Sequence, residues 1–588
     1  MNRHQRRAAG RDGRKGRGTT NQPGDETFHQ ALVSLAEGRF GDAEDACRLL
    51  LMERPGDENG QLVLATILLE TGRAPQALEV LEKVRLGRDP HRHFLHAKAL
   101  LMSQHFLEAE VAYGQALSIN PDYVEALTGR GTTRMILDRF EPAMADFSHA
   151  LDVDPNAEEA LSGLGFILIG AGRTEEALDL YRRAADRMPN SVEVQSRLAA
   201  LLVDMNEGEE ALACADRAIA LAPQVETPLR IRGYALLSLR RFEPALDCFG
   251  RLVATDPTDA DAHLAVAMTH VVAEQPEPAE KAIRAALACR TESLPARAML
   301  AEFLLRQGRF AEGWDMLRQI DAAVTERLPS DLTGETLVLD THLDFYGALF
   351  ALRFLKAAKT RGATLILRSQ PNTMTLLERV PGVDRVVASD EVIDGRPVKF
   401  FSLPWLLDLV DPQPNVVIAP RPDRVEEVRS RLAGTGDAPI VAVAWQSFAP
   451  SQIGRRLVPL EALAEALRPL DMRVAVIQRQ PAPGSLARFA SVLGRPVLDL
   501  TGLNDDPEGM LATLSLVDHM VAIAGGSVDL RAASGLGGCV LVDAAANYRW
   551  MAQGDRSPWF PDMTVHRQAV DGSWTDALQS VVRVLRSP

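Results

Sequence analysis

The 588-residue sequence lacks several features that mark whole classes of protein. No run of about 18 consecutive apolar residues occurs, so no transmembrane helix is expected. The five cysteines are scattered without a C-x-x-C pair, which argues against a zinc site and favours a reducing compartment. Positive charge is outnumbered, with 64 Lys and Arg residues against 79 Asp and Glu residues and a formal net charge of -15. Nucleic acid and anionic membranes are therefore poor candidates as partners, and a protein or a small molecule suits the chain better.

The N-terminus is basic but does not form a secretion signal. Its cationic residues are Arg3, Arg6, Arg7, Arg11, Arg14, Lys15 and Arg17. No apolar segment follows them, so a signal peptide is not expected and the protein is predicted to be cytoplasmic. Arginine and glycine without aromatic residues are typical of a solvated extension. We therefore expect residues 1–24 to form a disordered basic tail.

A 34-residue period runs through the N-terminal half. Prolines recur at Pro121, Pro155, Pro189, Pro223 and Pro257. Alanines recur in a second phase at Ala143, Ala177, Ala211, Ala245 and Ala279. Small residues hold a third phase at Gly131, Gly165, Ala199, Gly233 and Ala267, and large residues stand four positions beyond three of the alanines, at Phe147, Tyr181 and Phe249.

This period predicts pairs of antiparallel helices, because two helices approach closely only where a residue lacks bulk and a large neighbour then fills the contact. The prolines would end the second helix of each pair. The pattern resembles the tetratricopeptide repeat, L-G…A-x-x-x-F…P. Weaker copies with Gly38-Arg39-Phe40, Gly72-Arg73 and Gly308-Arg309-Phe310 extend it to about nine repeats over residues 25–328. Such a superhelix has a concave groove that holds peptides or partner proteins.

Beyond residue 328 the period ends and the sequence predicts an α/β region. β-rich and helical segments alternate at 336–340, 345–361, 363–367, 376–379 and 385–388. A proline-rich stretch around 411–422 precedes further β-rich segments at 440–445, 473–477, 497–500, 519–523 and 539–542. We predict two Rossmann-like halves, an N-terminal lobe at 329–422 and a C-terminal lobe at 423–588. A ligand is expected at the carboxyl ends of their strands, in the cleft between the halves.

One junction in the second half is typical of phosphate binding. The segment 519–523 runs into Gly525, Gly526 and Ser527, and a helix follows. Glycines allow the backbone to approach a ligand, and a helix N-terminus favours a diphosphate. The same residues also suit a simple helix start in which Ser527 is the cap and Asp529 favours the first turn. The sequence pattern alone leaves both interpretations open.

From about residue 332 onward the chain resembles the GT-B-type glycosyltransferase domain that follows tetratricopeptide repeats in many bacterial proteins, related to heptosyltransferases and O-linked N-acetylglucosamine transferases. The segments that carry the resemblance are 441–445, 454–456, 477–478, 525–529, 548–550, 555–561 and 565–568. The resemblance implies transfer of a sugar from a nucleotide-sugar donor, held mainly by the C-terminal half, without a cofactor or a metal.

The resemblance also implies roles for particular residues. Donor binding would fall to Gln446, Arg455, Arg456, Gln478, Gly525, Gly526, Ser527, Asp529, Tyr548 and Arg549. The two consecutive arginines would neutralise the diphosphate leaving group. For the general base that takes the proton of an acceptor hydroxyl, the candidates are His342 and Asp344, in the loop after the first strand.

The chain departs from the pattern of these relatives in two places. Residues 341–346 stand where these relatives usually have a glycine-rich G-L-G-D loop. Leu530 stands near the helix start where they commonly have a histidine. The sequence therefore leaves three functions open. The first is a protein O-glycosyltransferase whose repeats recruit a protein acceptor such as flagellin. The others are an adaptor with a degenerate transferase domain and a lipopolysaccharide-type sugar transferase. The acidic charge and the lack of a membrane helix weaken the third.

Overall fold

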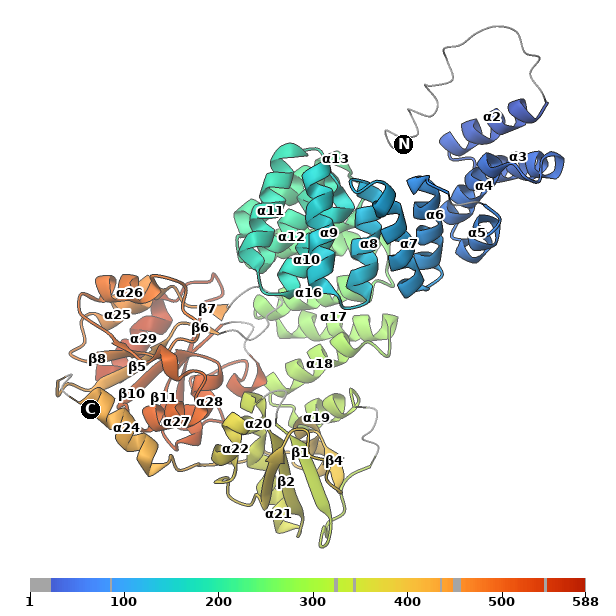
Figure 1. Ribbon diagram of the computed structural model, residues 1–588. Helices are drawn as coiled ribbons and strands as arrows, with labels where there is room; N and C mark the ends of the chain where they lie inside the picture. The colour runs from blue at the N-terminus through green and yellow to red at the C-terminus, as the bar shows by residue number, and fades with distance from the viewer. Residues whose placement is uncertain are drawn as a thin grey trace. The chain divides into compact units, whose positions relative to one another are not determined.

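The computed structural model describes residues 23–84, 87–321, 326–341, 345–433, 436–447, 456–543 and 547–586, except for the side chains of residues 23–25 and 456. The chain divides into two compact units, Met1–Leu198 and Ala199–Pro588. Paired helices occupy the first unit and the start of the second, and the two main sheets belong to the second unit (Figure 1).

The helices form nine consecutive pairs within the described residues. Those that begin in the first unit are α2 (Pro23–Ala36), α3 (Phe40–Glu53), α4 (Glu58–Glu70), α5 (Ala74–Leu81), α6 (Pro90–Met102), α7 (Phe106–Ile119), α8 (Val124–Ile136), α9 (Phe140–Val153), α10 (Glu158–Gly170), α11 (Thr174–Arg187) and α12 (Val192–Asp204). Those of the second unit are α13 (Gly208–Leu221), α14 (Glu226–Ser238), α15 (Phe242–Thr255), α16 (Ala260–Val272), α17 (Pro276–Cys289), α18 (Leu294–Arg306) and α19 (Phe310–Arg318).

Small and large residues interlock within these pairs as the period predicts. In the first unit, a Cβ atom added to Gly131 would lie 2.7 Å from the Phe147 ring, and one added to Gly165 would lie 2.1 Å from the Tyr181 hydroxyl oxygen. In the second unit, a Cβ atom on Gly233 would lie 2.5 Å from Phe249. A side chain at these positions would collide with a ring that is itself almost completely buried. The glycines therefore set the distance between neighbouring helices.

The first sheet of the second unit is fully parallel. It contains β1 (Thr336–Asp340), β2 (Thr364–Ser369), β3 (Arg385–Ala388) and β4 (Arg396–Val398), in the order β3-β2-β1-β4. Its helical segments are α20 (Phe345–Ala351), η1 (Leu352–Phe354), α21 (Leu355–Thr360), α22 (Pro371–Leu377), η2 (Phe400–Ser402) and α23 (Leu403–Leu406). The strand order along the chain switches sides between β1 and β4, although all four strands run in the same direction.

The second sheet has six parallel strands. They are β5 (Ile440–Ala444), β8 (Arg473–Val476), β9 (Leu498–Asp499), β10 (His519–Ile523), β11 (Gly538–Val542) and β12 (Met563–Arg567), in the order β12-β11-β10-β5-β8-β9. Counted along the chain this is the doubly wound order 3-2-1-4-5-6, whose topological switch point lies between β5 and β10. Strands β4 and β12 lie outside the segments expected from the sequence.

Helices cover both faces of the six-stranded sheet, as a parallel sheet requires. The remaining elements are α24 (Pro422–Leu432), α25 (Leu460–Leu467), α26 (Ser485–Leu493), η3 (Thr501–Leu503), α27 (Pro507–Leu516), α28 (Gly526–Ala533), η4 (Tyr548–Trp550) and α29 (Thr575–Arg586). One face packs Val443 and Val476 against Leu463, Phe489 and Val581 of α25, α26 and α29. The opposite face belongs to a larger core that includes α27 and α28.

That larger core also contains the last helix pair of the repeats. The Trp314 ring of α19 lies 5.9 Å from Trp559, 5.6 Å from Tyr548 and 6.0 Å from Phe354, measured between ring centroids. Trp559 is completely buried and also contacts Phe310 of α19 at 5.3 Å. The packing therefore continues across the expected boundary at residue 328, where only the sequence period ends.

An ion pair joins the two α/β lobes. Arg379, which follows α22, donates from Nη1 and Nη2 to the two carboxylate oxygens of Glu508 in α27, at 2.7 and 2.6 Å. The Thr375 hydroxyl donates to the same carboxylate at 2.9 Å. Because the Glu508 side chain is only 8% exposed, removing either partner of this bidentate pair would leave a buried charge unpaired, which costs more than breaking a surface pair.

A buried histidine on β12 leads to a pH-dependence prediction. Burial lowers the pKa of His566 from 6.5 to about 4. As the pH falls below 6.5, the unfolded chain binds a proton that the folded chain does not accept until about pH 4, so stability present above pH 6.5 is lost on acidification. We expect His566→Gln to reduce the loss of unfolding free energy between pH 7.5 and 5 by up to about 2 kcal/mol. Chemical denaturation of both proteins at the two pH values measures this, and equal losses would contradict it.

Candidate functional site

The carboxyl ends of β5 and β10 bring several of the predicted donor-binding residues together. Gln446 and Ser447 follow β5, and Gly525 follows β10, on the two sides of the switch point. A Cβ atom on Gly525 would lie 3.2 Å from the Ser447 hydroxyl oxygen, so the two strand ends touch. Open parallel sheets bind ligands outside such a point. This edge of the sheet is the candidate site.

A short antiparallel pair adds a basic residue to the same edge. Strand β6 (Gln446–Ser447) pairs with β7 (Arg456–Leu457), and the register places Arg456 opposite Ser447. The backbone of Arg456 therefore reaches the switch point. Arg455 lies outside the described residues, and of the Arg456 side chain nothing is described.

Helix α28 begins at the site without a side-chain cap. Gly525 is its N-cap residue, so Ser527 does not occupy the capping position considered from the sequence. The Ser527 side chain is half-exposed, and its hydroxyl group has no hydrogen-bond partner in the described part of the chain. A helix start of this kind offers unpaired donors to an anion.

An aromatic ring from the other lobe lies against this helix start. A Cβ atom on Gly526 would lie 2.7 Å from ring atoms of Tyr346, which belongs to α20. Burial raises the pKa of the Tyr346 hydroxyl above its ordinary value. The glycine is therefore required for close packing between α20 and α28, and the ring forms one wall of the site.

Gln478 is engaged in holding strand ends together. Its side-chain oxygen accepts from the backbone amides of Trp445 and Gln446 at 3.0 and 2.9 Å. Its side-chain nitrogen donates to the carbonyls of Gln446 and Arg479 at 3.2 and 2.9 Å. The side chain is completely buried. Gln478 therefore positions the ends of β5 and β8, and a ligand would reach its amide only by displacing these bonds.

Asp529, Arg549 and Tyr548 are likewise engaged with the protein. Arg549 donates to the two carboxylate oxygens of Asp529 at 3.2 and 3.3 Å, and its guanidinium carbon lies 4.3 Å from the centroid of the Phe350 ring. The two charged side chains are only 12% and 7% exposed. Tyr548 is buried beside Trp314, and burial raises its pKa to about 12. These three residues serve the core behind α28 in this structure.

The two candidate bases, His342 and Asp344, lie outside the described residues. In the sequence they follow β1, which ends at Asp340. Thr341 is described, and its hydroxyl oxygen lies 2.8 Å from the Arg368 carbonyl oxygen and 2.7 Å from the Ser369 hydroxyl oxygen, within hydrogen-bond distance of both. These contacts fix Thr341, the last described residue before both candidates.

Sequence reasoning missed two residues of the site, Tyr346 and Arg479. Arg479 directly follows Gln478 at the end of β8, and its side chain is half-exposed. It lies 3.7 Å from Asp505, which is 90% exposed, and it is close enough to Tyr346 to influence the pKa of that hydroxyl. The signal for Arg479 was a cation at the end of a predicted strand. No local pattern pointed to Tyr346, because its contact spans two lobes.

The paired helices match a known repeat family. Residues 34–101 and 168–229, residues 137–192 and 232–293, and residues 294–319 match profiles described as tetratricopeptide repeat. The paired helices are tetratricopeptide repeats. Repeats of this class form extended surfaces that bind other proteins, so the N-terminal part of the chain is suited to protein–protein interaction or scaffolding. Among curated proteins, none matches the chain in sequence.

Solved structures with tetratricopeptide repeats resemble the chain in part. A chain of the APC/C hetero-tetramer Cut9-Hcn1 is 16% identical, with a TM-score of 0.36 over 48% of this chain and 55% of its own. Yeast Tom70 is 20% identical, with a TM-score of 0.36 over 53% and 69%. YrrB, a TPR protein with an unusual peptide-binding site, is 22% identical, with a TM-score of 0.27 over 32% and 95%. TM-scores below 0.5 do not establish a shared overall fold, so no function is transferred from these proteins.

The described ranges contain no helix with the length and apolar character needed to cross a bilayer.

Proposed function

We propose that the chain is a protein glycosyltransferase of the GT-B kind, in which the tetratricopeptide repeats recruit a protein acceptor and the six-stranded sheet binds a nucleotide-sugar donor. The observation that supports this proposal is the convergence at one switch point of Gly525, the uncapped start of α28 and the backbone of Arg456. The lobe that carries the candidate bases contributes the facing Tyr346 ring.

The proposed chemistry uses the residues at this edge. The diphosphate of the donor would lie at the start of α28, with the Ser527 hydroxyl group and the Arg479 guanidinium as additional donors. A serine or threonine hydroxyl of the acceptor would attack the anomeric carbon and lose its proton to His342 or Asp344, while cationic groups stabilise the departing diphosphate. Flagellin is the acceptor class that the sequence resemblance suggests.

Calorimetry with UDP and GDP tests the donor site on the full chain. We expect Ser527→Ala and Arg479→Ala each to weaken nucleotide binding by about 10- to 100-fold, because a hydrogen bond to a charged group contributes about 1.5–3 kcal/mol. Matched controls are Ser534→Ala, at the other end of α28, where the hydroxyl donates to the Arg531 carbonyl, and Arg488→Ala, which is paired with Glu461. Equal affinity in all five proteins would contradict the proposal.

A second function, an adaptor with a degenerate transferase domain, is favoured by a separate observation. Gln478, Asp529 and Arg549 already have protein partners, and the Tyr346 ring lies on Gly526. If the wild type gives no heat with UDP, GDP or ADP while its repeats bind peptide, the adaptor is the better description. Donor hydrolysis by the wild type would exclude it.

A further inference from the structure

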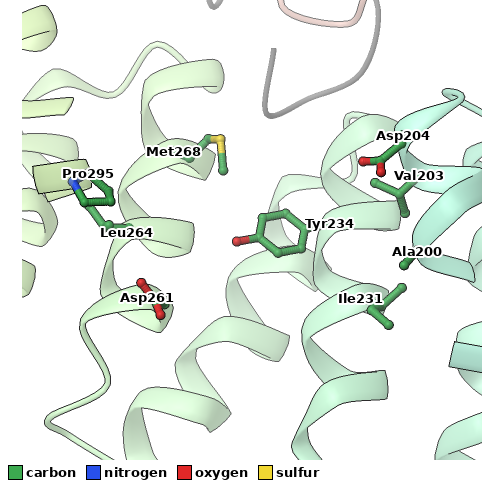
Figure 2. A pocket seen from close by; sticks show the side chains of 9 residues that line it. All are labelled: Ala200, Val203, Asp204, Ile231, Tyr234, Asp261, Leu264, Met268 and Pro295. Carbon is green, nitrogen blue, oxygen red and sulfur yellow. The ribbon is translucent and has the colours of Figure 1, made fainter. Parts of the chain in front are cut away.

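The tetratricopeptide repeats of the second unit line an open hollow of about 510 Å³ (Figure 2). It is lined by Ala200, Val203, Asp204, Ile231, Tyr234, Asp261, Leu264, Met268 and Pro295. All nine residues belong to α12, α14, α16 and α18, the first helices of four consecutive pairs. Figure 2 shows Tyr234 projecting between Leu264 and Met268 on one side and Val203 and Asp204 on the other.

The repeat period accounts for the shape of this hollow. Ala200, Tyr234 and Met268 are 34 residues apart, as are Asp261 and Pro295. Equivalent positions of successive repeats therefore face the same space, as expected for the inner surface of a solenoid. Most of the lining is apolar, and Tyr234 provides the largest side chain. An extended chain segment could bury apolar side chains there.

Two carboxylates face the hollow without partners. In the described part of the molecule, neither the Asp204 nor the Asp261 side chain makes a hydrogen bond or an ion pair. Asp261 lies in the first turn of α16, where a negative charge favours the helix. Asp204 is the last residue of α12, where the helix dipole opposes a negative charge. Asp204 therefore does not stabilise α12, and helix stability does not explain why an aspartate occupies this position.

The surroundings of the two carboxylates keep the hollow negative. Burial raises the pKa of the Asp204 carboxyl, so desolvation works against its negative charge and a cation placed beside it would favour the charged form. No lysine or arginine is among the lining residues. The nearby Arg230 guanidinium is engaged with Asp259 at 2.7 Å. A cation from a partner would therefore find two carboxylates without competition.

We propose that this hollow binds an extended peptide segment in which a lysine or arginine is flanked by apolar side chains. A cation of the segment would lie near Asp204 or near Asp261, which Figure 2 shows on opposite sides of Tyr234, and the apolar neighbours would pack on Tyr234, Leu264 and Met268. The proposal rests on the role of the repeats in recruiting a protein acceptor, and it gives that acceptor a recognition chemistry.

Selection from a random heptapeptide library on the immobilised full chain tests the proposal. Enriched peptides should contain lysine or arginine next to apolar residues, and their affinity, measured by fluorescence polarisation, should fall with increasing salt. The double variant Asp204→Asn with Asp261→Asn should weaken binding about tenfold or more, because it removes both charges while keeping the side-chain shape. Asp247→Asn on α15 is the matched control, since that aspartate does not line the hollow, and its affinity should be unchanged.

Several outcomes would overturn the proposal. Enriched peptides without a basic residue, or equal binding by the double variant, would refute the recognition chemistry while leaving acceptor recruitment intact. Failure to enrich any peptide would also refute it. Higher affinity after deletion of residues 1–22 would show that the basic N-terminal segment of this chain fills the hollow instead of a partner. Nucleotide calorimetry is independent of all these results, so the transferase proposal can fail separately.

Discussion

Replacing Gly165 with alanine is expected to lower the free energy of unfolding of the first unit by about 2–3 kcal/mol, because overpacking a tight core forces its neighbours to move. The new Cβ atom would lie 2.1 Å from the Tyr181 hydroxyl oxygen and 2.5 Å from the adjoining ring carbon. Tyr181 is only 2% exposed and has little room to move. Thermal unfolding followed by circular dichroism, together with urea denaturation, measures the change.

The same helix provides a matched control. Gly170, also in α10, has no atom within 4 Å of the position where a Cβ atom would be added. Gly170→Ala should therefore be neutral or stabilise the unit by up to about 1 kcal/mol through helix propensity. Combining Gly165→Ala with Tyr181→Leu should recover part of the loss, since the colliding ring is removed. Equal stability of the two single variants would contradict the interlocking geometry.

A fragment that begins at the end of the sequence period, residues 329–588, is expected to fail to fold as a stable unit. It lacks Trp314 and Phe310, which pack on Trp559. It also loses the Glu302 carboxylate, which accepts from the Tyr548 amide, and the Arg306 carbonyl, which accepts from the Ala552 amide at 3.0 Å. Removing one large aromatic from a core costs about 3–5 kcal/mol, and this cut removes two together with several hydrogen bonds.

The contrasting fragment is 192–588, which keeps α12 whole and retains the complete second unit. It should unfold cooperatively, whereas 329–588 should bind a hydrophobic dye and show no sharp transition. Trp314→Ala in the full chain should lower the unfolding free energy of the second unit by about 3–5 kcal/mol. A cooperative transition of 329–588 at the same temperature as that of 192–588 would show that the shared core is dispensable.

These two expectations show which aspects of the fold a sequence reveals. The Gly165 and Tyr181 contact lies within one helix pair and has counterparts in phase with it, Gly131 with Phe147 and Gly233 with Phe249, so a period is enough to predict it. Trp314 packs on Trp559 although the two residues are 245 positions apart in the sequence. This contact occurs once, so no periodic pattern in the sequence predicts it. Contacts that are local and repeated can be predicted from the sequence, whereas a single contact between distant segments is found only in the structure.

The candidate site divides in the same way. The junction at Gly525 follows from a strand, two glycines and a helix, and the switch point brings it beside Ser447. Gln478 also lies at a strand end, yet its amide bonds to the backbone of β5 and cannot be distinguished in sequence from a ligand-binding amide. Tyr346 reaches the helix start only because α20 and α28 pack across the lobes.

The shared core around Trp314 also constrains how such a chain can diversify. Repeat arrays change length by gaining or losing whole helix pairs, since each pair contacts mainly its neighbours. The pair α18–α19 is different, because Trp314 completes the packing of Trp559 and Tyr548. Recombination that exchanges this pair would leave the α/β part with an unfilled core. The pair α18–α19 is therefore expected to be inherited together with the two sheets. Duplications and deletions of helix pairs are expected on the N-terminal side of this pair.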